Sequence, residues 1–315
     1  MKPAAAVSID VDSLASIYKG KGCTNPDGYT YAEFRQGMDT LANFFDSYNI
    51  RSTLFLVGTD LRHPGNVIFV KDAHQAGHEL ANHSYNHPQG FRWLNPTEKE
   101  SQIKKMGELC EEVTGVRPVG FRSPGWNNDD ETLPIFKKLG YIYDSSVFPT
   151  FLMSLMKFSH WASMYKQAKP DRTTMGMWRY MFSPITPYRT TKLSLGRKGE
   201  EELVEFPVSV SPTARLPFFA TFFLLTGTRM FHHLYRLLRK KNIPIHFQMH
   251  LSDFVDYTMP ELQSQMPLDE KGVYVPQALA TPLKKKLKIF HEIIETIAAD
   301  YDFITLKEWA GKIGF

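Results

Sequence analysis

Two histidines stand four residues apart in the segment ELANHSYNHP, residues 79–88. Neutral imidazoles are the commonest ligands for zinc-like ions, and residues four apart share one face of a helical turn. His83 and His87 could therefore supply two ligands to a single ion. The spacing alone fits two ordinary surface histidines better, so a metal site requires a third ligand from elsewhere.

The first apolar run of the chain offers that ligand. Asp10 and Asp12 in SIDVDS are two residues apart, so on a strand both point to the same face. Acidic residues are depleted in strands, although an Asx turn or a cap for the next element would also explain them. Two histidines and one carboxylate leave coordination positions open for water or substrate, which is typical of a catalytic ion. The second carboxylate could then accept a proton from water, and the strand geometry allows either aspartate to be the ligand.

Two later stretches carry further candidates. Arg122 in GFRSPGW ends a predicted strand before a Pro-Gly turn, where its guanidinium could hold a carboxylate through two hydrogen bonds. The alternative is an ordinary surface arginine at a turn. In IHFQMHL, residues 245–251, alternation places His246 and His250 on one face, with His250 at the end of the strand. A histidine there could protonate a leaving amine, although a hydrogen-bonded core histidine fits the same pattern.

Short apolar runs alternate with longer amphipathic ones, which is the pattern of βα units. About seven such units favour an incomplete α/β barrel over an open sheet, and in barrels the chemistry gathers where strands end. For the helix near residue 95 we predict Thr97 as the N-cap, with Glu100 completing a capping box. The predicted strands are residues 7–11, 53–57, 78–81, 119–122, 141–143, 203–208, 245–249 and 303–306, and the predicted helices are 31–48, 67–75, 95–115, 129–139, 228–241 and 283–299.

Length and composition set limits on the class of protein. The 315 residues are within the range of a single α/β barrel, and 43% hydrophobic residues suffice for a sizeable core. The formal net charge of +4 is too weak to suggest a nucleic-acid partner. Cys23 and Cys110 form no disulfide pattern and indicate unpaired thiols in a reducing compartment. With no secretory signal and no apolar run of ~18 residues, we expect a cytoplasmic protein or one on the cytosolic face of a membrane.

Two segments depart from the βα rhythm. Residues 150–199 contain nine lysines and arginines but one acid, Asp171, together with many methionines and two tryptophans. We interpret this stretch as an insertion within a single domain covering residues 1–315. Together with the apolar run 216–225 it fits peripheral contact with an anionic membrane surface, which attracts nearby basic side chains at ~1 kcal/mol each. The alternative is a basic, solvated insertion over a methionine-rich core.

The motifs, taken in order, resemble those of a known family. Asp-x-Asp, GHELANHSYNHP, FRSPGW, YDSSVFP and HFQMH are similar to the motifs of the polysaccharide deacetylases, also called the NodB-homology family or carbohydrate esterase family 4. The resemblance covers about residues 7–254, and its most specific parts are His-Ser-x-x-His and Arg-x-Pro-x-aromatic. Members fold as a deformed (β/α)7 barrel, bind a divalent metal, usually zinc, and remove acetyl groups from sugars. The Asp-x-Asp start resembles a sub-branch of cytosolic enzymes that deformylate or deacetylate lipid-linked sugars.

The resemblance also implies a role for each matching residue. It implies Asp12, His83 and His87 as metal ligands, Asp10 as the general base, Arg122 as the residue that orients this base, and His250 as the general acid. It further implies a backbone amide near Ser145 or Ser146 in oxyanion stabilisation, and Trp126 and Asp144 near the substrate. The expected cofactor is one divalent ion, Zn²⁺ first, with Co²⁺, Ni²⁺, Mn²⁺ and Fe²⁺ as alternatives.

The function implied is hydrolysis of an N-acetyl or N-formyl group from an amino sugar. The expected substrate is a glycan precursor or a sugar linked to undecaprenyl phosphate, used in the synthesis of cell-envelope polysaccharide or lipopolysaccharide. Two alternatives stay open. One is an allantoinase-like hydrolase of a small non-sugar amide, and the other is a non-catalytic carbohydrate-binding barrel.

Overall fold

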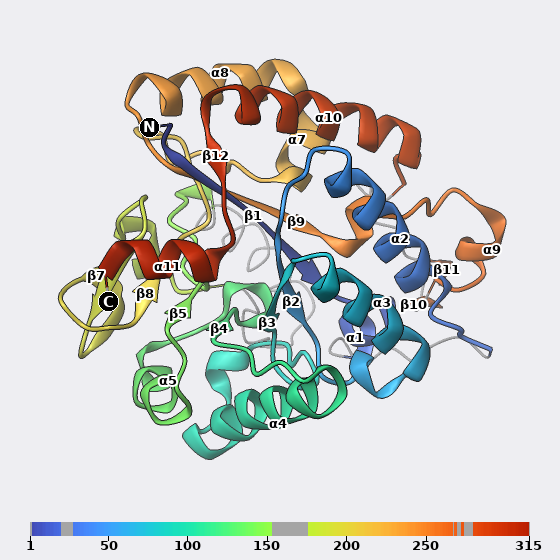
Figure 1. The fold of residues 1–315 in the computed structure, drawn as a ribbon, viewed down its shortest axis with the longest axis horizontal. Helices are drawn as coiled ribbons and strands as arrows, with labels where there is room; N and C mark the ends of the chain where they lie inside the picture. Colours follow the sequence, from blue (N-terminus) through green and yellow to red (C-terminus); the bar gives the residue numbers. More distant parts are fainter. Residues whose placement is uncertain are drawn as a thin grey trace, which may run out of the picture.

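Seven parallel strands form the inner wall of the fold (Figure 1). The computed structural model describes residues 2–19, 28–152, 176–266, 268–269, 272–273 and 280–314. In this part of the chain the strands pair in the order β9-β1-β2-β3-β4-β5-β8, and β12 pairs with the first residues of β1. The strands are β1 (Ala4–Val11), β2 (Thr53–Leu56), β3 (Glu79–Asn82), β4 (Gly120–Phe121), β5 (Tyr143–Asp144), β8 (Val204–Glu205), β9 (Ile245–His250) and β12 (Asp302–Phe303).

The two ends of this sheet approach each other. Beyond β8, the backbone N–H of Ser209 donates to the carbonyl of His246 in β9 at 3.2 Å. Pro207 lies between β8 and Ser209, and proline has no N–H with which to continue a ladder. The fold is therefore a deformed (β/α)7 barrel, which confirms the predicted fold class.

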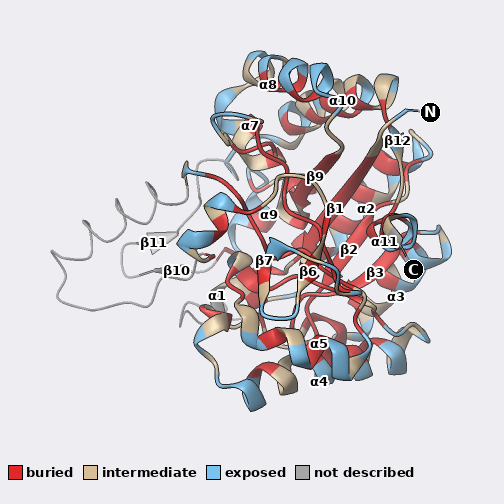
Figure 2. Ribbon diagram, turned by 90° about the vertical axis from the view of Figure 1, so that its left-hand side faces the viewer, coloured by how far each residue is buried: buried red, intermediate tan, exposed pale blue. Residues whose placement is uncertain are grey.

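Helices cover the outside of the barrel, with their exposed faces outward and the buried strands inside (Figure 2). In both views α8 and α10 lie side by side. The helices are α1 (Leu14–Lys19), α2 (Ala32–Asp46), α3 (Pro64–Gln75), α4 (Pro96–Thr114), α5 (Leu133–Leu139), α7 (Ala220–Thr226), α8 (Thr228–Lys240), α9 (Pro260–Gln263), α10 (Leu283–Asp300) and α11 (Leu306–Gly314).

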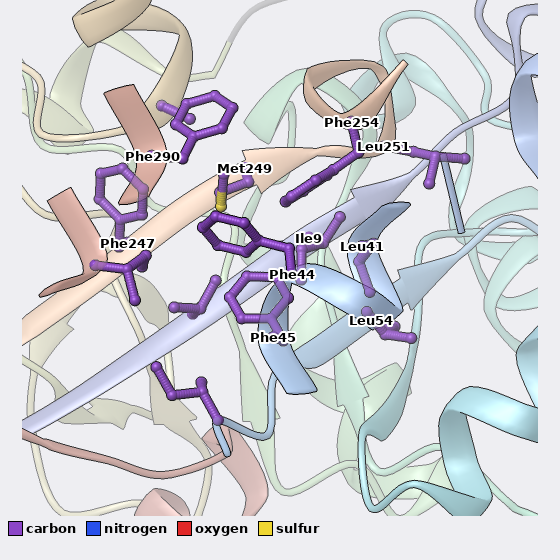
Figure 3. Packing of buried hydrophobic residues seen from close by; sticks show 14 of the residues in the cluster. Ile9, Leu41, Phe44, Phe45, Leu54, Phe247, Met249, Leu251, Phe254 and Phe290 are labelled. Atoms are coloured by element: carbon purple, nitrogen blue, oxygen red, sulfur yellow. The ribbon is translucent and has the colours of Figure 1, made fainter. Parts of the chain in front are cut away.

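The alternation of side chains along β1 separates core from site. Ile9 packs outward in a buried cluster with Met249 of β9 and with Phe44 and Phe45 of α2 (Figure 3). Because successive side chains on a strand point to opposite faces, Asp10 points into the barrel. Burial of each such large apolar side chain stabilises the fold by about 1.5–3 kcal/mol, and this outer layer holds the strands that carry the polar residues.

The start of α4 differs from the sequence expectation. Asn95, not Thr97, is the N-cap, and its side chain accepts the N–H of Glu98 while Glu98 accepts the N–H of Asn95. The capping box is therefore shifted by two residues. Pro96 explains the shift, because proline is favoured at the first helical position, where no N–H is needed.

The end of the chain also corrects the prediction of a strand over residues 303–306. The strand β12 ends at Phe303, and Leu306 begins α11. Leu306, Trp309 and Ala310 are buried in one cluster at helical spacing, so the apolar side of α11 packs on the barrel.

The predicted insertion is described only in part, because residues 153–175 lie outside the described residues. Its later half contains a hairpin that the sequence analysis missed, β6 (Tyr188–Thr191) and β7 (Ser194–Lys198). Strand β6 pairs antiparallel with β8, so this half extends the barrel sheet. A second small antiparallel pair, β10 (Leu268–Asp269) and β11 (Gly272–Val273), follows α9.

The apolar run 216–225 contributes largely to the core. Phe218, Ala220 and Phe223 are buried in the main cluster, whereas the Leu225 side chain is 59% exposed. Among the described helices, none combines the length and apolar character needed to cross a membrane. Cys110 is a buried free thiol, and Cys23 lies outside the described residues.

Candidate active site

Asp12, His83 and His87 converge just beyond the carboxyl ends of β1 and β3. Nε2 of His83 lies 3.5 Å from Oδ1 of Asp12, and Nε2 of His87 lies 3.7 Å from Oδ2. Two ligands of one tetrahedral ion at about 2 Å are about 3.3 Å apart, so these separations suit a shared cation. Oδ1 of Asp12 is buried and receives no hydrogen bond from any described residue, which also suits a cation.

The pKa shifts of Asp12, His83 and His87 also favour a bound cation. Burial, and then the negative charges of Asp10 and Asp60, raise the pKa of Asp12 well above its ordinary value. Burial lowers the pKa of His83 and lowers that of His87 to about 3, so both imidazoles stay neutral. A neutral imidazole has a free lone pair, and a bound cation would offset the cost of burying the carboxylate.

A hydrogen bond selects the tautomer of His83. Nδ1 of His83 lies 2.8 Å from the carbonyl oxygen of Arg122, which can only accept, so Nδ1 carries the proton. Nε2 therefore presents its lone pair toward Asp12. Such a partner on the second ring nitrogen is typical of metal-binding histidines.

The loop that follows Asp12 is held by a buried carboxylate. Asp60 accepts the backbone N–H of Ser13 at 3.0 Å and the hydroxyls of Ser13 and Ser16 at 2.6 and 2.7 Å. These three hydrogen bonds tie the start of α1 to residues 60–62. They keep the chain immediately after Asp12 in one conformation.

Asp10 is paired with Arg122 rather than with the histidines. Nη1 of Arg122 donates to Oδ1 of Asp10 at 2.5 Å, and both side chains are buried. Burial is the largest single influence and raises the pKa of Asp10, but the electrostatic attractions of Arg122, His83 and His250 together outweigh it, and the pKa is lowered to about 2. Asp10 is thus an ionised, oriented carboxylate beside the cluster of Asp12, His83 and His87, which we call the Asp12 group.

The guanidinium of Arg122 is fixed on every side. Nε donates to the carbonyl of Ser145, and Nη2 lies within hydrogen-bonding distance of Ser8 Oγ, Ser145 Oγ and His246 Nε2. The Phe55 ring lies 4.1 Å from the central guanidinium carbon. A residue held this rigidly can orient Asp10 without moving.

His250 lies at the end of β9 and is the most exposed of these polar groups. Its Nε2 is 3.9 Å from Oδ2 of Asp10, and its side chain is 28% exposed. Asp253, a candidate partner of its ring, bonds the backbone instead. Oδ2 of Asp253 accepts the N–H of His250 at 2.8 Å but lies 4.0 Å from Nδ1.

The backbone amides proposed for the oxyanion are already used. The N–H of Ser145 donates to the carbonyl of Phe121 at 2.9 Å, and the N–H of Ser146 is hydrogen-bonded to the carboxylate of Asp144. Parallel pairing of β4 and β5 engages the first N–H and a local turn engages the second, and the oxyanion role of an amide near these serines stays a prediction. The hydroxyl of Ser145 instead accepts a hydrogen bond from Arg122, and the hydroxyl of Ser146 accepts one from the N–H of Ser123.

The partners of Asp144 lie outside the group formed by Asp12, His83 and His87. Asp144 accepts hydrogen bonds from Ser146 and Asn128 and shares a hydrogen bond with Glu205. Burial raises its pKa to about 6. Within the described part of the chain, no hydrogen bond connects Asp144 with Asp10, Asp12 or the two histidines at residues 83 and 87, and its place near the substrate stays a prediction.

The indole of Trp126 is half-buried and bonds to a residue that the sequence analysis overlooked. Trp126 Nε1 donates to Gln248, and Gln248 donates to Asp10. Gln248 lies between His246 and His250 on the inner face of β9. The period-two pattern that singled out the histidines could have identified it.

The comparisons with known proteins agree with this architecture. A family model for polysaccharide deacetylases matches residues 24–143, a stretch that includes both site histidines and Arg122. The chain is 29% identical over 149 residues to a peptidoglycan deacetylase-like protein from Gibberella zeae, covering 45% of this chain and 43% of that protein. It is 27% identical over 145 residues to a peptidoglycan deacetylase from Helicobacter pylori, covering 45% and 48%. The chain thus spans a little under half the length of these curated relatives.

Solved structures share the fold along nearly the whole chain. A structure assigned to the polysaccharide deacetylases from Mycobacterium smegmatis superposes with a TM-score of 0.62 at 19% identity, covering 99% of this chain and 90% of that one. The allantoinase PuuE superposes with a TM-score of 0.57 at 13% identity, covering 98% and 88%. The match of residues 24–143 to the polysaccharide deacetylase model and the similarity to these relatives confirm the resemblance in the motifs. The place of the chain in an Asp-x-Asp sub-branch stays a prediction.

Proposed function

We propose that this chain is a metal-dependent hydrolase that removes an N-acyl group from an amino sugar. One observation carries the proposal: the Asp12, His83 and His87 group lies beside an ionised Asp10, which His250 faces at 3.9 Å. This arrangement offers an ion site, a proton acceptor and a proton donor within one rim of the barrel. The relatives named as peptidoglycan deacetylases support an N-acylated amino sugar as the substrate.

The side chains divide the work of amide hydrolysis. Asp10 accepts the proton of the attacking water, and Arg122 keeps it ionised and oriented for this step. The water oxygen joins the acyl carbon, and the carbon–nitrogen bond breaks as His250 gives a proton to the departing amine. A divalent ion, when bound, supplies the Lewis acidity that polarises an acyl carbonyl and acidifies water.

The ligand set favours a particular kind of ion. Two imidazole nitrogens and one carboxylate oxygen suit Zn²⁺ best, with Co²⁺, Ni²⁺, Mn²⁺ and Fe²⁺ as alternatives. Three protein ligands leave coordination sites for water and substrate, as in catalytic rather than structural centres. Metal analysis of the purified protein identifies the ion.

The finer part of the proposal is a lipid-linked sugar at an anionic membrane surface on the cytoplasmic side. Phe151, Trp178 and Phe182 border residues 153–175 and are 40%, 63% and 66% exposed. Exposed aromatic side chains among many basic residues suit the interface of an anionic bilayer. Such a location would bring the barrel to a sugar carried on a polyprenyl phosphate.

A substrate panel tests the function. We expect the metal-loaded protein to release acetate or formate from N-acyl amino sugars, with the lipid-linked sugar preferred over the free one. Hydrolysis of allantoin alone would instead support a small-amide hydrolase. Sugar binding without release of any acid would support a non-catalytic barrel.

Membrane contact needs its own test, because removing residues 151–199 would also remove β6 and β7 from the sheet. We expect the double variant Trp178→Ala/Phe182→Ala to lose binding to vesicles that contain anionic lipid. Trp93→Ala, at a 43% exposed tryptophan, is the matched control and should bind like the unchanged protein. Unchanged binding of the double variant would contradict the membrane part alone.

A further inference from the structure

Gln248 connects the side chain of Trp126 to that of Asp10. Its Nε2 donates to Oδ2 of Asp10 at 2.7 Å, and its Oε1 accepts the indole N–H of Trp126 at 3.0 Å. Gln248 is fully buried in β9, where it is the register partner of Ser8, two residues before Asp10. The three side chains therefore form a chain of hydrogen bonds from the FRSPGW loop to Asp10.

The donor and acceptor of each of these two hydrogen bonds follow from the chemistry of Trp126 and Asp10. An indole N–H can only donate, and an ionised carboxylate can only accept. The amide of Gln248 therefore has one orientation in which both hydrogen bonds form, with its oxygen toward Trp126 and its nitrogen toward Asp10. The reversed amide would place N–H against N–H and oxygen against oxygen, and would lose both bonds.

We propose that Gln248 is a positioning residue for Asp10 and that Trp126 fixes the amide of Gln248 in its donating orientation. This inference rests on the proposed function, in which Asp10 receives the proton of water. Arg122 holds Oδ1 of Asp10 and Gln248 holds Oδ2, so the carboxylate is secured at both ends and cannot rotate about its Cβ–Cγ bond. Oδ2 is also the oxygen nearer to His250.

The backbone conformation and the ring contacts of Trp126 fix the position of its indole. Trp126 has a φ of 55°, a left-handed conformation that is rare for a bulky residue and costs about 1–3 kcal/mol. Its ring packs against Phe148 at 4.8 Å and Phe219 at 6.0 Å between ring centres. These contacts hold the indole with its N–H toward Gln248, so the orientation of Asp10 depends on the seating of the loop 122–126.

Kinetics of two variants and their combination test the proposal. Gln248→Met keeps the length of the side chain but loses both hydrogen bonds, and we expect kcat to fall about 10- to 100-fold with KM and ion content unchanged. Trp126→Phe keeps a ring but loses the N–H, and kcat should fall about 3- to 10-fold. Because the two residues act in series, the double variant should match Gln248→Met alone. Multiplied effects, or an unchanged kcat in Gln248→Met, would overturn the proposal.

Two controls and a measurement without substrate complete the test. Gln75→Met and Trp93→Phe, at exposed positions, should leave kcat unchanged. In a ¹⁵N-labelled protein the indole signal that disappears in Trp126→Phe should shift in Gln248→Met and stay in place in Gln75→Met. An unmoved signal in Gln248→Met would refute the link. Since this measurement needs no turnover, it decides the link even if the protein releases no acyl group, an outcome that refutes only the proposed function.

Discussion

Asp10 and His250 are direct partners in the parallel register of β1 and β9, with Nε2 of His250 3.9 Å from Oδ2 of Asp10. Both side chains occupy the barrel face at the carboxyl ends of adjacent strands. In the proposed amide hydrolysis, the proton acceptor and the proton donor therefore stand side by side, next to Asp12, His83 and His87.

We expect the metal content of the protein to depend on His83 and His87. The purified protein should contain about one divalent ion per chain, and His83→Ala and His87→Ala should each lose it, because the remaining two ligands cannot hold the ion tightly. Elemental analysis after dialysis measures the content. His233→Ala, at an exposed position on α8, should keep the ion. Stoichiometric ion in a His83→Ala/His87→Ala double variant would refute the site.

Substitution of each aspartate in turn should distinguish the role of Asp10 from that of Asp12. Asp10→Asn should abolish turnover and keep the ion, because Asp10 pairs with Arg122, whereas Asp12→Asn should lose ion and turnover together. Metal analysis and an acyl-release assay on the same samples distinguish the two. The reverse result would exchange the roles of the aspartates and leave the reaction class intact.

Loss of His250 should affect the chemical step alone. His250→Ala should lower kcat about 10²- to 10⁴-fold, as expected for a positioned proton donor, while the ion stays bound. An acyl-release assay and metal analysis of the same sample measure both. An unchanged kcat would show that His250 has a structural role.

Arg122 should matter for stability as well as rate. In Arg122→Ala, Asp10 would be a buried carboxylate without its charge partner, which should lower the free energy of unfolding by about 3–5 kcal/mol at pH 7. With the attraction of Arg122 removed, the effect of burial on Asp10 is opposed less and its pKa rises, so the acid limb of the rate profile should move to higher pH. Urea unfolding and a pH–rate series test both parts. Arg117→Ala, which breaks an exposed pair with Glu111, should cost less than about 1 kcal/mol.

His78 should make the fold sensitive to mild acid. Burial lowers the pKa of His78 to about 4, and its Nδ1 accepts the N–H of Ser52. The unfolded chain then binds a proton that the folded chain excludes, so stability should be fully present above pH 6.5 and decline toward pH 4, by up to about 3 kcal/mol from this residue. Urea midpoints across this range should fall less steeply in His78→Gln than in the unchanged protein. Equal slopes would show that His78 does not contribute.

Much of the site is predictable because its residues end strands. Asp10, His83, Arg122 and His250 each lie at or next to the end of a predicted strand, and the carboxyl ends of parallel strands meet at one rim. Period-two alternation places Asp10 on the inner face of β1 and Ile9 on the outer face. Local patterns of this kind are enough to predict the barrel and the set of polar groups at its rim.

Only the tertiary structure decided how those groups are partnered. Spacing places Asp10 and Asp12 on one face without distinguishing them, whereas the register of β1 with β9 and the reach of Arg122 pair Asp10 with the guanidinium and leave Asp12 to the histidines. The amide of Ser145 is spent on pairing between β4 and β5. Sequence alternation sets which face a side chain occupies, but its hydrogen-bond partner depends on register and closure between strands that are distant in the chain.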